Sequence, residues 1–213
     1  MKRIALALTM ALALGACSSG SSKPAASSGP PTTTAGSSQT SQAPTSAPAG
    51  ANPNAPEVNA AGDIPDNQVY VAYTPPSGGF SVKVPEGWAR TEAGGAVTFT
   101  DKLNSVRMET VAAASAPTVQ SAQQQEVPAI QASVRRYEAG KVTAVTRKAG
   151  TGVLITYRAD AAPDPVTAKV VHDDVERYEF WKAGKLVILT LSGPQGADNV
   201  DPWRIVTDSF SWQ

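Results

Sequence analysis

The chain has 213 residues, 41% of them hydrophobic, and its 18 Lys and Arg residues balance its 18 Asp and Glu residues. A balanced charge without a basic stripe argues against nucleic acid as a partner, because affinity for nucleic acid comes mainly from clustered cations that neutralise phosphates. One histidine and one cysteine are too few for a zinc site, which takes three or four nitrogen, sulfur or oxygen ligands. We therefore expect neither nucleic acid nor a cofactor.

Residues 1–16 have the composition of an export signal. Two basic residues precede an apolar run over residues 4–14, which is too short to span a bilayer as a helix. The run ends in Leu14-Gly15-Ala16-Cys17, where small residues separate the leucine from the cysteine. This pattern resembles the lipobox of bacterial lipoproteins. The resemblance implies cleavage of a signal peptide between Ala16 and Cys17 and attachment of diacylglycerol to the thiol of Cys17.

Cys17 is the single cysteine of the chain, so we expect no disulfide in the folded part, although an exported protein meets an oxidising environment. Two or more acyl chains on this residue, such as palmitate, would anchor the protein stably, since each buried methylene contributes about 0.8 kcal/mol. The membrane partner is then the outer face of the cytoplasmic membrane. The alternative is an ordinary secretory signal with an incidental cysteine.

Residues 17–62 are predicted to form a disordered, lipid-anchored linker. From residue 18 onward they are almost all Ser, Ala, Pro, Thr, Gly, Gln and Asn, and Val58 is the one aliphatic residue larger than alanine. Such a segment cannot bury enough apolar area to offset the entropy of ordering the backbone. The linker is either an O-glycosylated stalk or an unmodified spacer. Its Ala, Pro and Gly content is typical of a high-GC actinobacterium.

Residues 63–213 have the length of one domain with a substantial core. Short β-branched or aromatic runs with period two predict strands, and they lie at residues 80–84, 97–99, 106–108, 142–147, 153–158 and 178–180. All residues of 186–191 except Thr190 are apolar. Both faces of a strand over these residues are therefore apolar, which predicts a central strand covered on both faces. Gly150-Thr151-Gly152 and Ala183-Gly184 predict hairpin turns.

Two helices are expected to interrupt the strands. The first lies within residues 118–137, where Ile130, Val134 and Tyr137 share one helical face and Pro128 marks a kink or a late start. The second begins at Asp201-Pro202, with an inward stripe formed by residues 203, 206 and 210. The predicted fold class is therefore α+β, a largely antiparallel sheet of about six or seven strands packed between helices.

Both ends of this domain carry a resemblance to a known family. Residues 79–88, Gly-Phe-Ser-Val-Lys-Val-Pro-Glu-Gly-Trp, look like the opening strand and turn of PsbP-like domains, and residues 201–212 look like their closing helix. Together with the lipobox, the chain is similar to the LpqN-type lipoproteins of mycobacteria and relatives. The resemblance implies an antiparallel sheet between helices and no catalytic residues. It also implies a binding or assembly protein, as in photosystem subunits, a yeast Ran-binding protein and actinobacterial envelope lipoproteins.

Candidates for catalysis or metal binding are few. His172 would have to serve any Ser-His-Asp triad, and adjacent residues such as Asp173 and Asp174 rarely reach the required geometry. Glu176 and Glu179 could pair as glycosidase acids, but they would lie on opposite faces of a strand. A calcium site made of carboxylates alone would lack the spacing of an EF-hand loop. The carboxylates considered for it are Asp160, Asp164, Asp173 and Asp174. We predict no catalytic residue and no metal ligand.

The segment 159–174 is the candidate partner-binding loop. It is long for a hairpin connection, and long loops on rigid scaffolds often carry function. The residues expected to contact a partner are Asp164, Val166, Val170, His172 and Asp173. The alternative is a plain surface loop or an extra edge strand.

These observations favour a membrane-anchored cell-envelope lipoprotein that acts as a non-enzymatic binding or assembly module. Its partner would be an envelope protein or a cell-wall component. Two alternatives stay open: a carrier of a lipid or small apolar ligand held between sheet and helix, and an envelope hydrolase that uses His172.

Overall fold

The computed structural model describes residues 60–213, so the predicted signal peptide, Cys17 and the linker up to residue 59 lie outside the described residues. No helix within 60–213 is long and apolar enough to cross a membrane. The strands are β1 (Tyr70–Tyr73), β2 (Phe80–Pro85), β3 (Ala89–Ala93), β4 (Ala96–Asp101), β5 (Asn104–Ala112), β6 (Arg135–Arg147), β7 (Gly150–Asp160), β8 (His172–Lys182), β9 (Lys185–Pro194) and β10 (Ser211–Trp212). The helical segments are α1 (Val119–Ser121), the π-helical turn η1 (Ala122–Glu126), α2 (Val127–Ser133) and α3 (Val200–Ser209).

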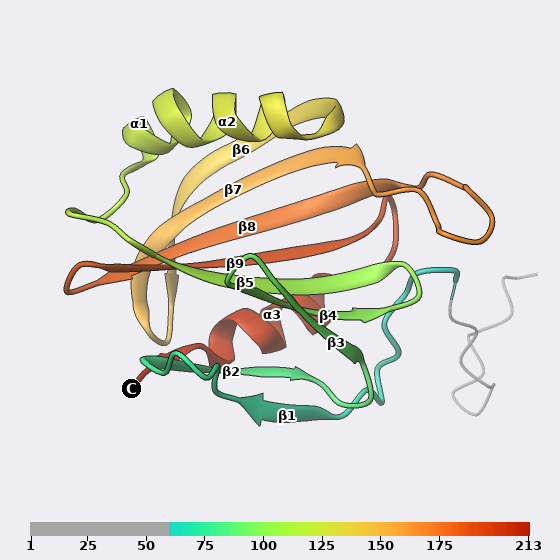
Figure 1. The fold of residues 1–213 in the computed structure, drawn as a ribbon, viewed down its shortest axis with the longest axis horizontal. Helices are drawn as coiled ribbons and strands as arrows, with labels where there is room; N and C mark the ends of the chain where they lie inside the picture. The colour runs from blue at the N-terminus through green and yellow to red at the C-terminus, as the bar shows by residue number, and fades with distance from the viewer. Residues whose placement is uncertain (1–59) are drawn as a thin grey trace, which may run out of the picture. The chain divides into compact units, whose positions relative to one another are not determined.

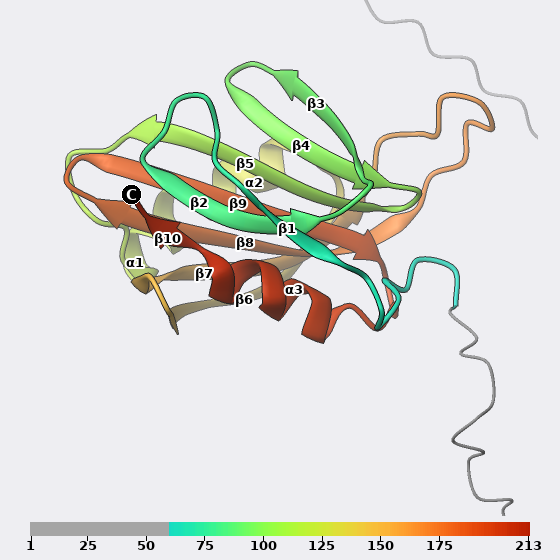
Figure 2. The same cartoon turned by 90° about the horizontal axis from the view of Figure 1, so that it is seen from below.

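Seven strands form one antiparallel sheet in the order β3-β4-β5-β9-β8-β7-β6, and β1-β2-β10 form a smaller antiparallel sheet. The predicted central strand is confirmed, because β9 is the middle strand of the seven. The continuous helical segment α1-η1-α2 covers one face, and α3 and β2 pack on the other (Figures 1 and 2). The expected α+β architecture, a sheet packed between helices, is confirmed.

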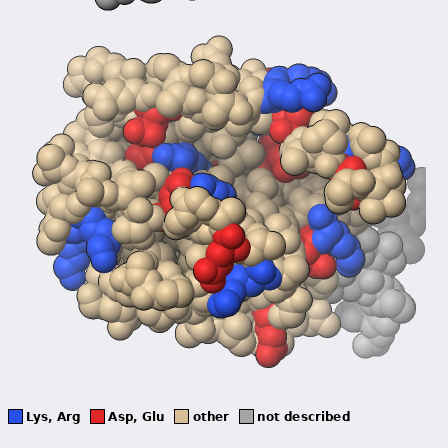
Figure 3. Space-filling model, viewed as in Figure 1, with Lys and Arg blue, Asp and Glu red and all other residues tan. Residues whose placement is uncertain are grey.

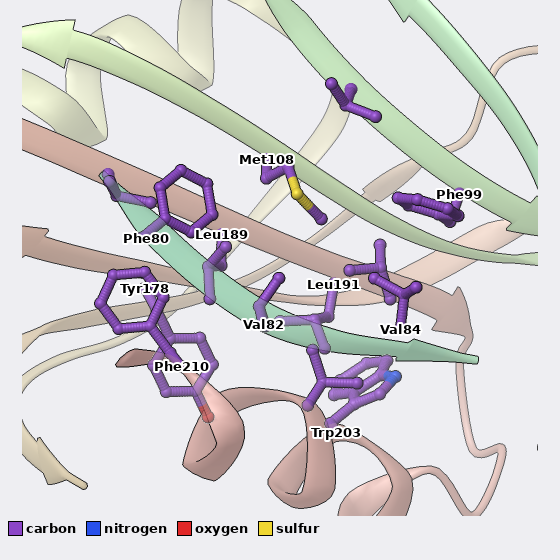
Figure 4. Packing of buried hydrophobic residues seen from close by; sticks show 14 of the residues in the cluster. Phe80, Val82, Val84, Phe99, Met108, Tyr178, Leu189, Leu191, Trp203 and Phe210 are labelled. Carbon is purple, nitrogen blue, oxygen red and sulfur yellow. The ribbon is translucent and has the colours of Figure 1, made fainter. Parts of the chain in front are cut away.

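The larger core lies between the seven-stranded sheet, β2 and α3 (Figure 4). Its aromatic centre is Phe210, whose ring stacks on Phe180 at 4.8 Å and meets Phe80 at 5.4 Å. Trp203 and Val206 of α3 point into the same core, as the predicted inward stripe requires. A smaller core beneath the helical segment contains Ala122, Ile130, Val153 and Ile155.

The first helix was predicted to extend to residue 137, which is beyond its observed end. The helical segment ends at Ser133, Val134 has extended backbone angles, and Tyr137 belongs to β6. Arg136, with φ of 50°, interrupts any regular continuation of the helix. Pairing of β6 with β7 supplies the backbone hydrogen bonds from residue 135 onward, so the sheet overrides the helical spacing of the apolar residues. Pro128 follows the π-helical turn within a segment that is already helical from Val119, so it does not mark a late start of the helix.

The hairpin between β6 and β7 is confirmed, but its turn is not the predicted Gly150-Thr151-Gly152. Arg147 pairs with Gly150, which leaves Lys148 and Ala149 as the turn. Gly152 lies within β7, where a Cβ atom would collide with the carbonyl oxygen of Glu179. Glycine is therefore needed there for close approach of two strands rather than for a turn.

Helix α3 begins at Val200 rather than at Asp201, and its N-cap is Asn199. The Asn199 side chain makes no capping bond, because it is engaged in other hydrogen bonds. Its Oδ1 accepts from the Ile64 amide at 2.9 Å, and its Nδ2 donates to the Gly62 carbonyl at 3.1 Å and to Asn104 Oδ1 at 3.0 Å. A residue that ordinarily caps a helix thus fastens residues 62–64 to the sheet.

We expect Phe210→Ala to lower the free energy of unfolding by about 3–5 kcal/mol, because it removes a fully buried ring and leaves a cavity against Phe180. Urea unfolding followed by far-UV circular dichroism measures this loss. Val166→Ala, at a side chain that is 90% exposed, is the control and should change stability by less than about 0.5 kcal/mol. Equal effects of the two substitutions would contradict the assigned core.

Candidate functional site

A cavity of about 400 Å³ lies at one end of the seven-stranded sheet, on the face that α3 covers. Strands β6, β7 and β8 form one wall, and the connection from β9 into α3 forms the other. The lining is half polar and half apolar. Its charged members are Glu138, Arg158, Asp174 and Glu176, and its apolar members include Ala139, Pro194, Ala197, Val200 and Trp203.

Two irregularities in β6 shape this wall. The pairing of β6 with β7 shifts register between Arg135 and Glu138 and again between Ala139 and Val142. Glu138 and Ala139, which lie between the two shifts, and Gly140, which lies within the second, all line the cavity. Gly140 lies so close to β7 that a Cβ atom would collide with the carbonyl oxygen of Thr156. Bulges of this kind bend a strand and re-aim its side chains, and here they bring Glu138 to the cavity.

Ion pairs cross the strands at the cavity wall. Arg158 Nε donates to Asp174 Oδ1 at 2.6 Å, and Arg158 Nη1 lies 4.0 Å from Glu138 Oε2. Asp174 Oδ2 also accepts from the backbone amide of Gly196 at 3.2 Å. Glu176 accepts a 2.7 Å hydrogen bond from the hydroxyl of Tyr178. Burial, with help from Glu176, raises the pKa of Tyr178 to about 12, so this phenol stays protonated as a donor.

His172 lies beside the cavity with a carboxylate at each ring nitrogen. Its Nδ1 is 3.1 Å from Asp160 Oδ1, and its Nε2 is 3.4 Å from Glu138 Oε1 without making a hydrogen bond. Arg136 also reaches Asp160, at 3.3 Å. The partner of His172 is therefore neither neighbour in sequence but the residue opposite it in the β7–β8 register. An acid on both sides of the ring leaves no nitrogen facing a hydroxyl nucleophile.

Asp173 faces the opposite side of the sheet from His172, because adjacent residues of β8 alternate in direction. It is 6% exposed, and its Oδ1 has no hydrogen-bond partner. Burial raises the pKa of Asp173 to about 6, with a smaller opposing effect from the Ser192 hydroxyl. The structure thus separates two residues of the predicted partner-binding loop onto different faces.

The other three predicted contact residues lie in the loop between β7 and β8, which extends beyond the sheet (Figure 1). The carboxylate of Asp164 accepts from the amides of Val166 and Thr167 at 3.0 and 2.6 Å, which fixes a tight turn. Val166 and Val170 expose 90% and 42% of their surface. Residues 161–171 form a loop rather than an edge strand, whereas both ends of the predicted segment 159–174 belong to β7 and β8. A role of the loop in partner binding stays a prediction.

A second charged cluster lies on the face beneath the helical segment, where Figure 3 shows acidic and basic side chains side by side. Arg177 is its centre, and its guanidinium contacts Glu179 at 2.9 Å, Glu126 at 3.2 Å and Glu109 at 3.8 Å. Arg107 holds Glu109 through two hydrogen bonds of 2.6 and 2.9 Å. Glu179 is fully buried, and this burial raises its pKa. The cluster joins η1 to β8 and β5, which gives it a structural role.

The four carboxylates considered for calcium do not converge. Asp164 lies in the loop, and Asp173 faces away from Asp160 and Asp174. In residues 60–213 no group of three or more His, Cys, Asp or Glu side chains is arranged to hold a metal ion.

No family model and no curated protein matches the chain. Among solved structures, the PsbP of the cyanobacterium Synechocystis is similar over 71% of this chain and 98% of its own, with 18% identity and a TM-score of 0.48. LpqN of Mycobacterium tuberculosis, involved in cell envelope biogenesis, is similar over 70% of this chain and 92% of its own, with 10% identity and a TM-score of 0.41. A Bacteroides thetaiotaomicron protein is similar over 67% of this chain with 14% identity and a TM-score of 0.45, and this chain spans 48% of its length. Structural neighbours thus include PsbP-like and LpqN-like proteins at low identity, and no ligand or residue role is transferred from them.

The raised pKa of Asp173 predicts a pH-dependent stability. A carboxyl group whose pKa rises from 3.8 to about 6 on folding adds stability that is fully present below about pH 3.8 and is lost as the pH rises through about 6. We therefore expect Asp173→Asn to raise the free energy of unfolding at about pH 7.5 and to flatten its decline above about pH 4.

Urea unfolding at several pH values measures this effect. Asp66→Asn, at an exposed carboxylate, is the matched control and should keep the wild-type pH dependence. If Asp173→Asn follows the wild-type curve as well, Asp173 is not the buried acid described above.

Proposed function

We propose that the chain is a lipid-anchored lipoprotein of the cell envelope whose folded domain is a non-enzymatic binding module. The observation that carries the second half of the proposal is the placement of His172 between two carboxylates, Asp160 and Glu138. General-base catalysis needs a ring nitrogen that faces the proton it removes. Here the single histidine of the chain supports the charged wall of a cavity instead.

The anchoring half of the proposal rests on the lipobox-like Leu14-Gly15-Ala16-Cys17 and on the linker composition up to residue 62. Lipid on Cys17 would place the domain at the outer face of the cytoplasmic membrane. A linker rich in Ser, Pro and Ala would let it reach an envelope protein or a cell-wall component some distance from the bilayer.

The end of the domain that holds the cavity also carries two other features. Residues 62–64 are fastened there by Asn199, and the loop between β7 and β8 extends from the same end of the sheet (Figures 1 and 2). The exposed valines of that loop offer apolar contact area beside the charged cavity. This combination supports recognition of a partner at this end.

The carrier alternative is less well supported. The space between the sheet and α3 is filled by aromatic and aliphatic side chains (Figure 4). The cavity beside it carries four charged side chains, and a wholly apolar ligand would desolvate them without replacing their hydrogen bonds.

Cys17→Ser tests the anchor. Without a thiol to receive diacylglycerol, we expect the variant to accumulate unprocessed or to appear in the soluble fraction, while the wild type stays with the membranes. Fractionation of cells, immunoblotting and intact mass measurement follow the outcome. Ser18→Ala is the matched control and should leave localisation and mass shift unchanged. A Cys17→Ser protein with wild-type migration and membrane association would rule out lipidation at this site.

Crosslinking in cells tests the binding module. We expect the chain, purified after crosslinking, to enrich an envelope component relative to a control in which residues 1–62 carry an unrelated domain. Val166→Asp should reduce this enrichment several-fold if the loop contributes apolar contacts, because a charge at a buried interface costs affinity. Enrichment that does not exceed the control would overturn the proposal.

A further inference from the structure

The cavity at the end of the sheet carries an excess of negative charge. Its lining includes three carboxylates, Glu138, Asp174 and Glu176, and one cation, Arg158. Arg158 is already committed to Asp174 at 2.6 Å and approaches Glu138 at 4.0 Å. Glu176 accepts a hydrogen bond from the Tyr178 hydroxyl, which in turn accepts one from Arg147 Nη2 at 3.1 Å. Arg147 forms its ion pair with Asp208, and among residues 60–213 no Lys, Arg or His forms an ion pair with Glu176 directly. One carboxylate on the wall is thus free to pair with a cation from outside.

Apart from Asn199, the opposite wall is apolar. Pro194, Ala197, Val200 and Trp203 line it. Val200 exposes 65% of its surface although it is a large aliphatic residue at the first position of α3. A short aliphatic chain placed along this wall would remove apolar surface from water, at roughly 25 cal/mol per Å².

The size and construction of the cavity suit a small ligand. A volume of about 400 Å³ lies within the range of small-molecule sites. The β6 bulges hold Glu138 in place, and the close approach of Gly140 to Thr156 fixes the strand. The carboxylates therefore come from strands of a paired sheet rather than from the loop, which favours a preformed site.

We propose that this cavity binds an ammonium group on a short aliphatic stem, the chemistry of a lysine-type side chain. The inference rests on the proposed function, because it names the ligand class that the binding module takes. The ammonium group pairs with Glu176, and the stem lies against Val200 and Trp203. An anion would be repelled by the net charge of the lining, and a neutral stem would leave Glu176 without a cation in direct contact.

Isothermal titration calorimetry on the full processed chain, purified in detergent, tests the inference. The probe is Nα-acetyl-lysine-N-methylamide, and its matched neutral form carries an acetyl group on the side-chain nitrogen. We expect the ammonium form to bind about tenfold more tightly or better. Added salt should weaken its binding more than that of the neutral form, because ions screen the charge pair.

Two substitutions should shift affinity in opposite directions. Glu176→Gln keeps the acceptor for the Tyr178 hydroxyl but removes the charge, so affinity for the ammonium probe should fall about tenfold. Arg158→Gln removes the competing cation, so affinity should rise. Glu86→Gln, at an exposed carboxylate outside the cavity, is the control and should leave affinity unchanged. Thermal unfolding shows that each variant is folded.

Equal affinity for the two probes, no binding of the ammonium probe, or an unchanged affinity of folded Glu176→Gln would each overturn the inference, as would weaker binding by folded Arg158→Gln. Enrichment of an envelope component in cells without ammonium binding would overturn this inference alone and leave the proposed function standing. Ammonium binding without any enriched envelope component would overturn the proposed function and leave the ammonium site standing.

Discussion

The architecture depends on one strand that is apolar on both faces. In β9, Val187, Leu189 and Leu191 point toward α3 and β2, while Leu186 and Ile188 point toward the helical segment, and all five are buried. Neither face of this strand can be left to water, so the sheet needs a cover on each side. The helices, the small sheet and the two cores follow from that requirement. The closing helix α3 covers the side with the larger aromatic residues, where most of the burial lies.

The cover on the other face has an electrostatic consequence. The helical segment α1-η1-α2 covers charged positions of β8, so Arg177 and Glu179 do not face open water. A buried charge is costly unless it is paired, and Arg177 meets this requirement by contacting three carboxylates, with Glu126 supplied by the π-helical turn itself. The unusual turn η1 therefore coincides with the position from which an acidic side chain reaches the sheet.

Much of the fold could be predicted because period-two patterns depend on local sequence alone. They predicted β2, β4, β5, β7, β8, β9 and the second half of β6, and they correctly separated Glu176 from Glu179 by face. They missed β1, β3 and β10. They could not reveal that the polar face of β8 would be covered, since cover depends on where α2 docks. The site was less predictable still: His172 meets Asp160 through strand register, and Glu138 reaches the cavity through bulges in β6. The expected helix ended at residue 137 and the expected strand began at residue 142, so neither assigned Glu138 to the wall that β6 forms.

The alternation and the register of β8 also decide where the charged side chains near residue 172 lie. Along the sequence, His172 is followed directly by two aspartates. In the sheet the alternation of β8 sends Asp173 to the far face, and the register gives His172 to Asp160 while Glu138 occupies the other side of the ring. The ring therefore lies between two acids at the edge of the cavity. The remaining carboxylate of the cavity, Glu176, accepts a hydrogen bond from the phenol of Tyr178 and has no cation in direct contact among residues 60–213. This wall of negative charge stands opposite Val200 and Trp203 at the start of α3, so the ligand that we propose for the cavity would be selected by its charge and its shape.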